Sequence, residues 1–79
     1  MSRLDLTGLA RVEIPPARRR EIEAEARALG ARIYAARRVM SADWRVVVSG
    51  AGRPPLVLHG YGPLEAVIAG ALEDWQAAA

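Results

Sequence analysis

Hydrophobic side chains recur along the C-terminal quarter of the chain at intervals of three and four residues. The stripe comprises Leu64, Val67, Ile68, Ala71, Leu72 and Trp75. This spacing is typical of a helix that buries one broad face. Gly62 and Pro63 precede the stripe, so we expect the helix to begin there.

A narrower stripe of the same kind lies in the first half of the chain. Ile22, Ala26 and Leu29 are separated by four and three residues, and the positions between them are mostly charged. We therefore predict a helix from Pro16 to about Leu29. Proline suits the first turn of a helix because its missing N–H would be unpaired there, and Gly30 suits a left-handed stop.

Between the two helices the apolar positions alternate with polar ones, which indicates strands with one buried side. The alternation runs through "ARIYAARRVM", "WRVVVSG" and "PLVLHG", and the short turns "SAD" and "GAGRP" separate these segments. Three consecutive strands joined by short turns predict an antiparallel meander. Its buried side would carry Ala31, Ile33, Ala35, Val39, Trp44, Val46, Val48, Leu56 and Leu58.

The N-terminal segment alternates only weakly. A short edge strand at residues 11 to 14 would be ended by Pro15 and Pro16, and the sequence leaves open whether it forms. We expect residues 1 to 10 to be loosely ordered.

These elements define a single domain over residues 1 to 79 of the α+β class. We predict two layers: an antiparallel sheet of three strands, or four with the edge strand, and two helices on one face of it. The order of elements is (β)αβββα.

The composition excludes several kinds of chemistry. The chain has no cysteine and one histidine, His59. Disulfides are therefore impossible, and one histidine makes no metal site unless several carboxylates converge on it. No spacing aligns His59 with Ser41 or Ser49 as a base with a nucleophile. We expect no metal, no cofactor and no enzymatic activity.

No apolar run approaches the length of about 20 residues that a membrane-spanning helix needs, and no signal-peptide pattern opens the chain. We expect a cytoplasmic protein without membrane contacts.

Charge is distributed unevenly. Residues 1 to 53 contain all eleven arginines and six acids, a formal +5, whereas residues 54 to 79 contain three acids and no base, a formal −3. These values sum to the net charge of +2. Such polarity orients a small domain against a charged partner.

The side of the predicted sheet that faces away from the helices combines arginines, an aromatic residue and aliphatic residues, as interface cores do. We predict it to be the partner-binding surface. Alternatively, this side faces water or pairs with a second copy, so the chain would be a monomer or a weak homodimer. The candidate residues are Arg32, Tyr34, Arg38, Arg45, Val47, Val57 and His59.

Three arginines at the start of the first helix, Arg18, Arg19 and Arg20, form a second candidate group. The positive end of the helix dipole disfavours arginine there, but pairs such as Arg18 with Glu21 and Arg19 with Glu23 would offset that cost. We expect these arginines to contribute secondary, electrostatic attraction to a partner.

The order of one helix, three strands and a helix over about residues 17 to 78 resembles the double-stranded-RNA-binding domain. That family places basic residues at the start of its second helix, where this chain has Gly62, Pro63, Leu64 and Glu65, so its RNA-binding residues are not carried over. The segment "WRVVVSGAGRPPLVLHGYGPLEAVIAGALEDW" is similar in pattern to the core of HicB-type antitoxins. Both resemblances imply a binding scaffold.

The chain also resembles, in kind, the small inhibitors that phages make against host defence, among them the anti-CRISPR proteins. We predict a non-enzymatic inhibitor of a host protein or nucleoprotein complex, with a type I CRISPR surveillance complex (Cascade) as the target and block of target DNA binding as the effect. Two alternatives remain open: a nucleic-acid-binding domain that uses the arginine-rich sheet face, and an antitoxin-like partner-binding protein.

Overall fold

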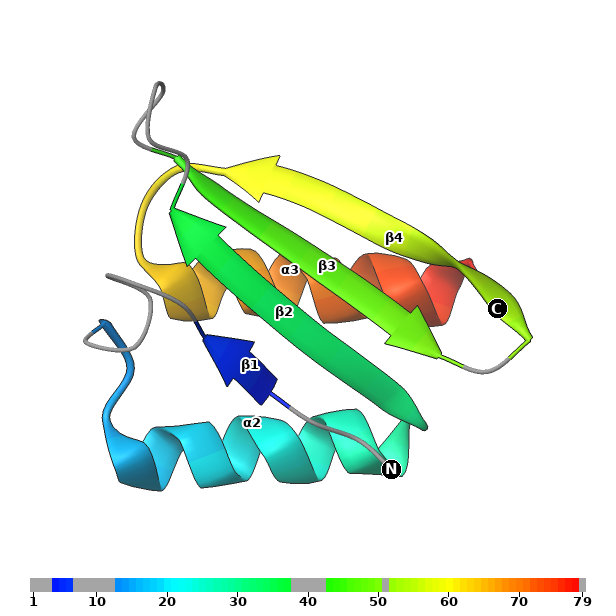
Figure 1. The fold of residues 1–79 in the computed structure, drawn as a ribbon, viewed down its shortest axis with the longest axis horizontal. Helices are drawn as coiled ribbons and strands as arrows, with labels where there is room; N and C mark the ends of the chain where they lie inside the picture. Colours follow the sequence, from blue (N-terminus) through cyan, green and yellow to red (C-terminus); the bar gives the residue numbers. More distant parts are fainter. Residues whose placement is uncertain (1–3, 7–12, 38–42, 51, 79) are drawn as a thin grey trace.

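The computed structural model describes residues 4–6, 13–37, 43–50 and 52–78 of the chain. In chain order the elements are β1 (Leu4–Leu6), α2 (Pro16–Ala28), β2 (Ala31–Arg37), β3 (Trp44–Gly50), β4 (Arg53–Gly60) and α3 (Leu64–Ala77). The predicted α+β class and the order of one helix, three strands and a helix are confirmed (Figure 1).

The sheet has the strand order β1-β2-β3-β4. Strands β2, β3 and β4 form the predicted antiparallel meander, whereas β1 pairs with β2 in parallel, with Leu4 beside Ile33. Strands β1 and β2 run parallel because α2 lies between them in the chain. The helix returns the chain to the end of the sheet at which β1 begins, so β2 runs in the same direction as β1.

The sequence left open whether residues 11 to 14 form an edge strand, and the structure has no strand at the residues that it describes there. Glu13 and Ile14 are not in a strand, and Arg11 and Val12 lie outside the described residues. Ile14 is instead fully buried in the core just before α2. The fourth strand, β1, lies in the segment expected to be loosely ordered.

Both helices cover the same face of the sheet. Ile22 and Ala26 of α2 belong to one buried cluster with Ile33 of β2 and Val46 of β3, and the buried side of α3 completes it. The helices run side by side, and α3 lies behind β3 and β4 in Figure 1. The six predicted apolar positions of the second helix are all buried: Leu64, Val67, Ile68, Ala71, Leu72 and Trp75.

Two glycines explain how the elements join. Gly30 ends α2 with φ of 65°, the left-handed conformation predicted for it. Gly50, at the end of β3, makes room for Trp75, because a Cβ atom there would lie 2.8 Å from the indole ring. This close approach lets the C-terminal part of α3 rest against the sheet.

Candidate protein-binding surface

The face of the sheet opposite the helices carries six of the seven predicted partner-binding residues. Residues of β2 and β3 alternate between buried and accessible positions, as a sheet covered on one face requires. We call this surface the open face and define it by Arg32, Tyr34, Arg45, Val47, Val57 and His59. The seventh predicted residue, Arg38, lies outside the described residues.

An apolar row crosses the open face at its middle. Tyr34 of β2 pairs with Val47 of β3, and Val47 pairs in turn with Val57 of β4. Directly opposed side chains on one face of an antiparallel pair are about 5 Å apart at Cβ. The three side chains therefore form one continuous apolar strip across three strands.

Polar and basic residues flank this apolar row on both sides. On one side Arg45 pairs with His59, and on the other Arg32 pairs with Ser49. Arg32, Arg45 and His59 are all exposed. An apolar centre with a charged rim is the arrangement of a protein–protein contact surface.

The apolar row is accessible to a partner. Tyr34 is 38 % exposed and Val57 is 47 % exposed, and Val47 between them is partly buried.

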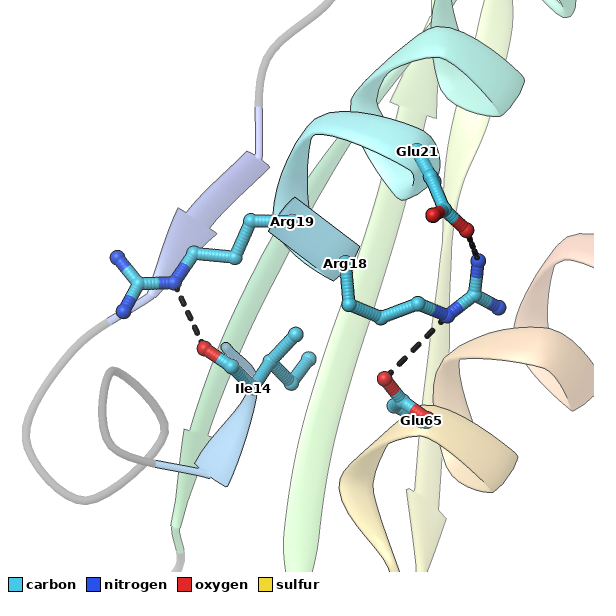
Figure 2. Close-up of polar contacts among 5 residues, drawn as sticks. All are labelled: Ile14, Arg18, Arg19, Glu21 and Glu65. Carbon is cyan, nitrogen blue, oxygen red and sulfur yellow. Dashed lines mark hydrogen bonds and ion pairs between the residues drawn. The ribbon is translucent and has the colours of Figure 1, made fainter. Parts of the chain in front are cut away.

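The arginines at the start of α2 lie in the helical layer rather than on the open face. Arg18 donates to Glu21 at 2.6 Å and pairs through Nε with Glu65 of α3 at 3.3 Å, so it joins the first turns of the two helices (Figure 2). The hydrogen bond to Glu21 raises the pKa of Arg18 above its ordinary value, and the charges of Glu21, Glu65 and Glu25 act in the same direction.

Arg19 and Arg20 differ in their environment. Nε of Arg19 donates to the carbonyl oxygen of Ile14 at 2.9 Å, which ties the segment before α2 to its first turn (Figure 2). Arg20 is exposed and makes no hydrogen bond or ion pair with any residue that the structure describes. The predicted pair of Arg18 with Glu21 is formed, and the predicted pair of Arg19 with Glu23 stays a prediction.

Sequence reasoning missed three contacts made by side chains of β3 and β4. The guanidinium of Arg53 lies 3.7 Å from the ring centroid of Trp75, and its Nη2 donates to the carbonyl oxygen of Trp75 at 2.5 Å. Nε1 of Trp44 donates to the carbonyl oxygen of Gly62 at 3.0 Å. Asp43, beside Trp44, is a buried acid with its own partner. Arg53 and Trp75 are 22 positions apart in the sequence, and Trp44 and Gly62 are 18 positions apart, separations at which no local pattern gives a signal.

The geometry also bears on catalysis. His59 pairs with Arg45 across the sheet, so Ser49 lies four residues farther along β3, about 13 Å away. That separation is too large for a base and its nucleophile. Ser41 lies outside the described residues. Within the described part of the chain, no three His, Asp or Glu residues gather as metal ligands would.

Comparison of the chain with protein-family models, with curated proteins and with solved structures gave no match. Because no match was found, a proposal for function must come from the geometry and chemistry of the open face.

No helix within the described residues is both long enough and apolar enough to cross a membrane.

Proposed function

We propose that the chain is a non-enzymatic protein-binding domain and that the open face is its contact surface. The apolar row of Tyr34, Val47 and Val57, flanked by exposed arginines, is the observation that supports this proposal. Tyrosine and arginine are the residue types, with tryptophan, that most often dominate binding energy at protein interfaces. A rigid sheet presents them without a large ordering cost.

The charges of the open face define the partner it fits. Arg32 and Arg45 are exposed, and the open face as defined carries no acidic residue. A partner surface with acidic groups around an apolar centre would complement it, because opposite charges speed encounter and the apolar centre slows dissociation. Acidic DNA mimicry does not fit a chain of net charge +2.

We further propose that the protein acts as an inhibitor of the anti-CRISPR kind in the host cytosol. The partner to test first is a type I surveillance complex, whose binding of target DNA would be blocked when the domain occupies an acidic or mixed protein surface. An antitoxin-like role would use the same surface on a different protein partner.

Direct nucleic-acid binding is a second candidate function, and the same face supports it. An aromatic side chain on an open sheet can stack on a base while neighbouring arginines contact phosphates. Tyr34 with Arg32 and Arg45 provides such a group. The absence of a second exposed aromatic residue among the six that define the open face weighs against this function.

Salt dependence separates the two functions. The experiment is a titration of the purified protein against a purified type I surveillance complex, duplex DNA, duplex RNA and single strands at 50 mM and 200 mM salt. We expect the protein to bind the complex and to prevent it from binding target DNA. Between 50 mM and 200 mM salt, the affinity for the complex should fall less than about tenfold. If Arg32, Arg45 and His59 instead neutralised two or three phosphates, affinity would fall about 12-fold to 40-fold over the same range of salt.

The variant pair Tyr34→Ala with Arg45→Ala, measured beside the control Arg20→Gln, assigns the binding to the open face. The proposal is supported if the double variant loses binding and the Arg20→Gln control keeps it. Binding of bare nucleic acid at 200 mM salt, with no binding to the complex, favours the second function.

A further inference from the structure

Strand β4 leaves one edge of the sheet without a strand partner among the described residues. The opposite edge of the sheet is β1, a strand of only 3 residues, whereas β4 has 8 residues, is the last strand in the order and is the outermost in Figure 1. The backbone N–H and C=O groups along such an edge pair readily with another extended segment. Natural proteins usually protect a free edge with charges, prolines or bulges.

Charge does not protect this edge, and proline protects only its first part. No charged residue occurs between Arg53 and Glu65. Pro54 and Pro55 lack the N–H that a ladder needs, and they coincide with an irregularity in the pairing of β3 with β4 between Val48 and Gly50. The part of the edge available for pairing is therefore residues 56–60.

We propose that this edge binds a second copy of the chain, with two β4 strands pairing antiparallel about a two-fold axis at Leu58. In this register Leu56 of each copy lies opposite Gly60 of the other, and both prolines fall outside the ladder. A neutral segment paired with itself suffers no charge repulsion. A two-fold axis through opposed strands stands perpendicular to the sheet, so the two sheets become one and both open faces point the same way.

The same register brings a second pair of features together. Tyr61, which directly follows β4, is 75 % exposed. It would lie opposite Pro55 of the second copy, at the rim of a pocket of about 210 Å³ lined by Arg53, Pro54, Pro55, Leu56, Trp75 and Ala78. The symmetry makes this contact twice. The register that keeps the prolines outside the ladder thus also sets the exposed Tyr61 against Pro55, which favours a second copy over an unrelated strand.

The interface would be small, so the dimer should be weak and concentration-dependent. The dimer does not depend on the function proposed above, because it would form through backbone groups along the edge of β4. The open face would bind through side chains, of which only Val57 and His59 belong to β4.

Single-cysteine variants test the register directly, because the chain contains no cysteine. Directly opposed residues in an antiparallel pair have Cα atoms about 4.5 to 5.5 Å apart, which a disulfide spans. Leu58→Cys should cross-link at least about tenfold faster than Ala24→Cys, an exposed control on α2. Val57→Cys should be slow, since Val57 would lie opposite His59 of the second copy.

Sedimentation of the unmodified protein over a concentration series provides the second readout. We expect reversible dimerisation that Tyr61→Ala weakens about tenfold, while Tyr34→Ala, which removes the tyrosine of the open face, leaves it unchanged. The proposal would be overturned if the protein is a monomer at every concentration and Leu58→Cys cross-links no faster than the control. Fastest cross-linking by Val57→Cys would also overturn it. So would amide protection of residues 56–60 that appears only when a different protein is bound.

Discussion

The two faces of the sheet are built from the same three strands, yet they have opposite chemistry. In β3 the neighbours Val46 and Val48 are fully buried under the helices, while Val47 between them lies on the open face beside Tyr34 and Val57. The covered face is apolar and closed, and the open face combines an apolar row with exposed arginines. We expect stability to reside on the covered face and the proposed binding on the open face, so substitutions should separate them.

The largest expected effect comes from truncating adjacent valines on opposite faces. Val46→Ala removes two buried methyl groups and leaves a cavity under the helices, so it should lower the free energy of unfolding by about 2 to 3 kcal/mol. Val47→Ala should lower it by less than about 1 kcal/mol, because its side chain is only partly buried. Urea unfolding followed by tryptophan fluorescence measures both. Equal losses would contradict the division between the faces.

A pair of glycines tests the packing of α3 on the covered side. Gly50→Ala places a methyl group 2.8 Å from Trp75, in a position with backbone on its other side, and should destabilise the protein by about 2 kcal/mol. Gly70→Ala, inside α3, meets only Leu58 at 3.8 Å. That substitution should stabilise the helix by about 0.5 to 1 kcal/mol. Thermal unfolding gives the sign of each change, and a stable Gly50→Ala variant would show that Trp75 is not held against the sheet.

Arginines on the two sides should also behave differently. Arg53 stacks on Trp75 and bonds to a carbonyl at the C-terminal end of α3, so Arg53→Ala should cost about 1 to 2 kcal/mol. Arg32→Ala, on the open face, should leave the free energy of unfolding within about 0.5 kcal/mol of the original. The two variants compared by chemical unfolding test this, and a larger loss for Arg32 would mean that the open face contributes to stability.

The smallest expected difference lies between neighbouring arginines of α2. Arg19→Gln loses the bond to the Ile14 carbonyl and should lower the free energy of unfolding by about 1 kcal/mol. Arg20→Gln should be neutral, since Arg20 is exposed and unpaired among the described residues. Melting temperatures measured side by side resolve the pair. A matching decrease for Arg20 would show that the loss does not come from the bond to the Ile14 carbonyl.

Much of the fold follows from local pattern. The apolar stripe of α3 predicted all six of its buried residues, and alternation predicted the buried sides of β2 and β3. The parallel strand β1 was not predicted, because three residues are too few to show a period and its pairing with β2 depends on where α2 returns the chain. The sequence also left open whether residues 11 to 14 form a strand, because its weak alternation fits equally well with the burial of Ile14 in the core that the structure has.

The candidate site was predictable as a set of residues but not as an arrangement. Alternation assigned Tyr34, Val47 and Val57 to one side of the sheet, while their alignment in a single row depends on the register, which hairpin geometry sets. The ion pair of Arg18 with Glu65 joins two helices that are distant in sequence. Arg18 is one of the three arginines at the start of α2 that we expected to attract a partner. Its pair with Glu65 instead helps to hold the two helices together.

The dissociation rate of the protein from a type I surveillance complex, measured for variants of the two faces, tests the central claim most directly. We predict that Tyr34→Ala with Arg45→Ala raises the dissociation rate at least about tenfold, with unfolding free energy nearly unchanged. Arg20→Gln, in the helical layer, should dissociate like the unmodified protein. An unchanged dissociation rate for the open-face variant, or faster dissociation for Arg20→Gln alone, would contradict the assignment of binding to the open face.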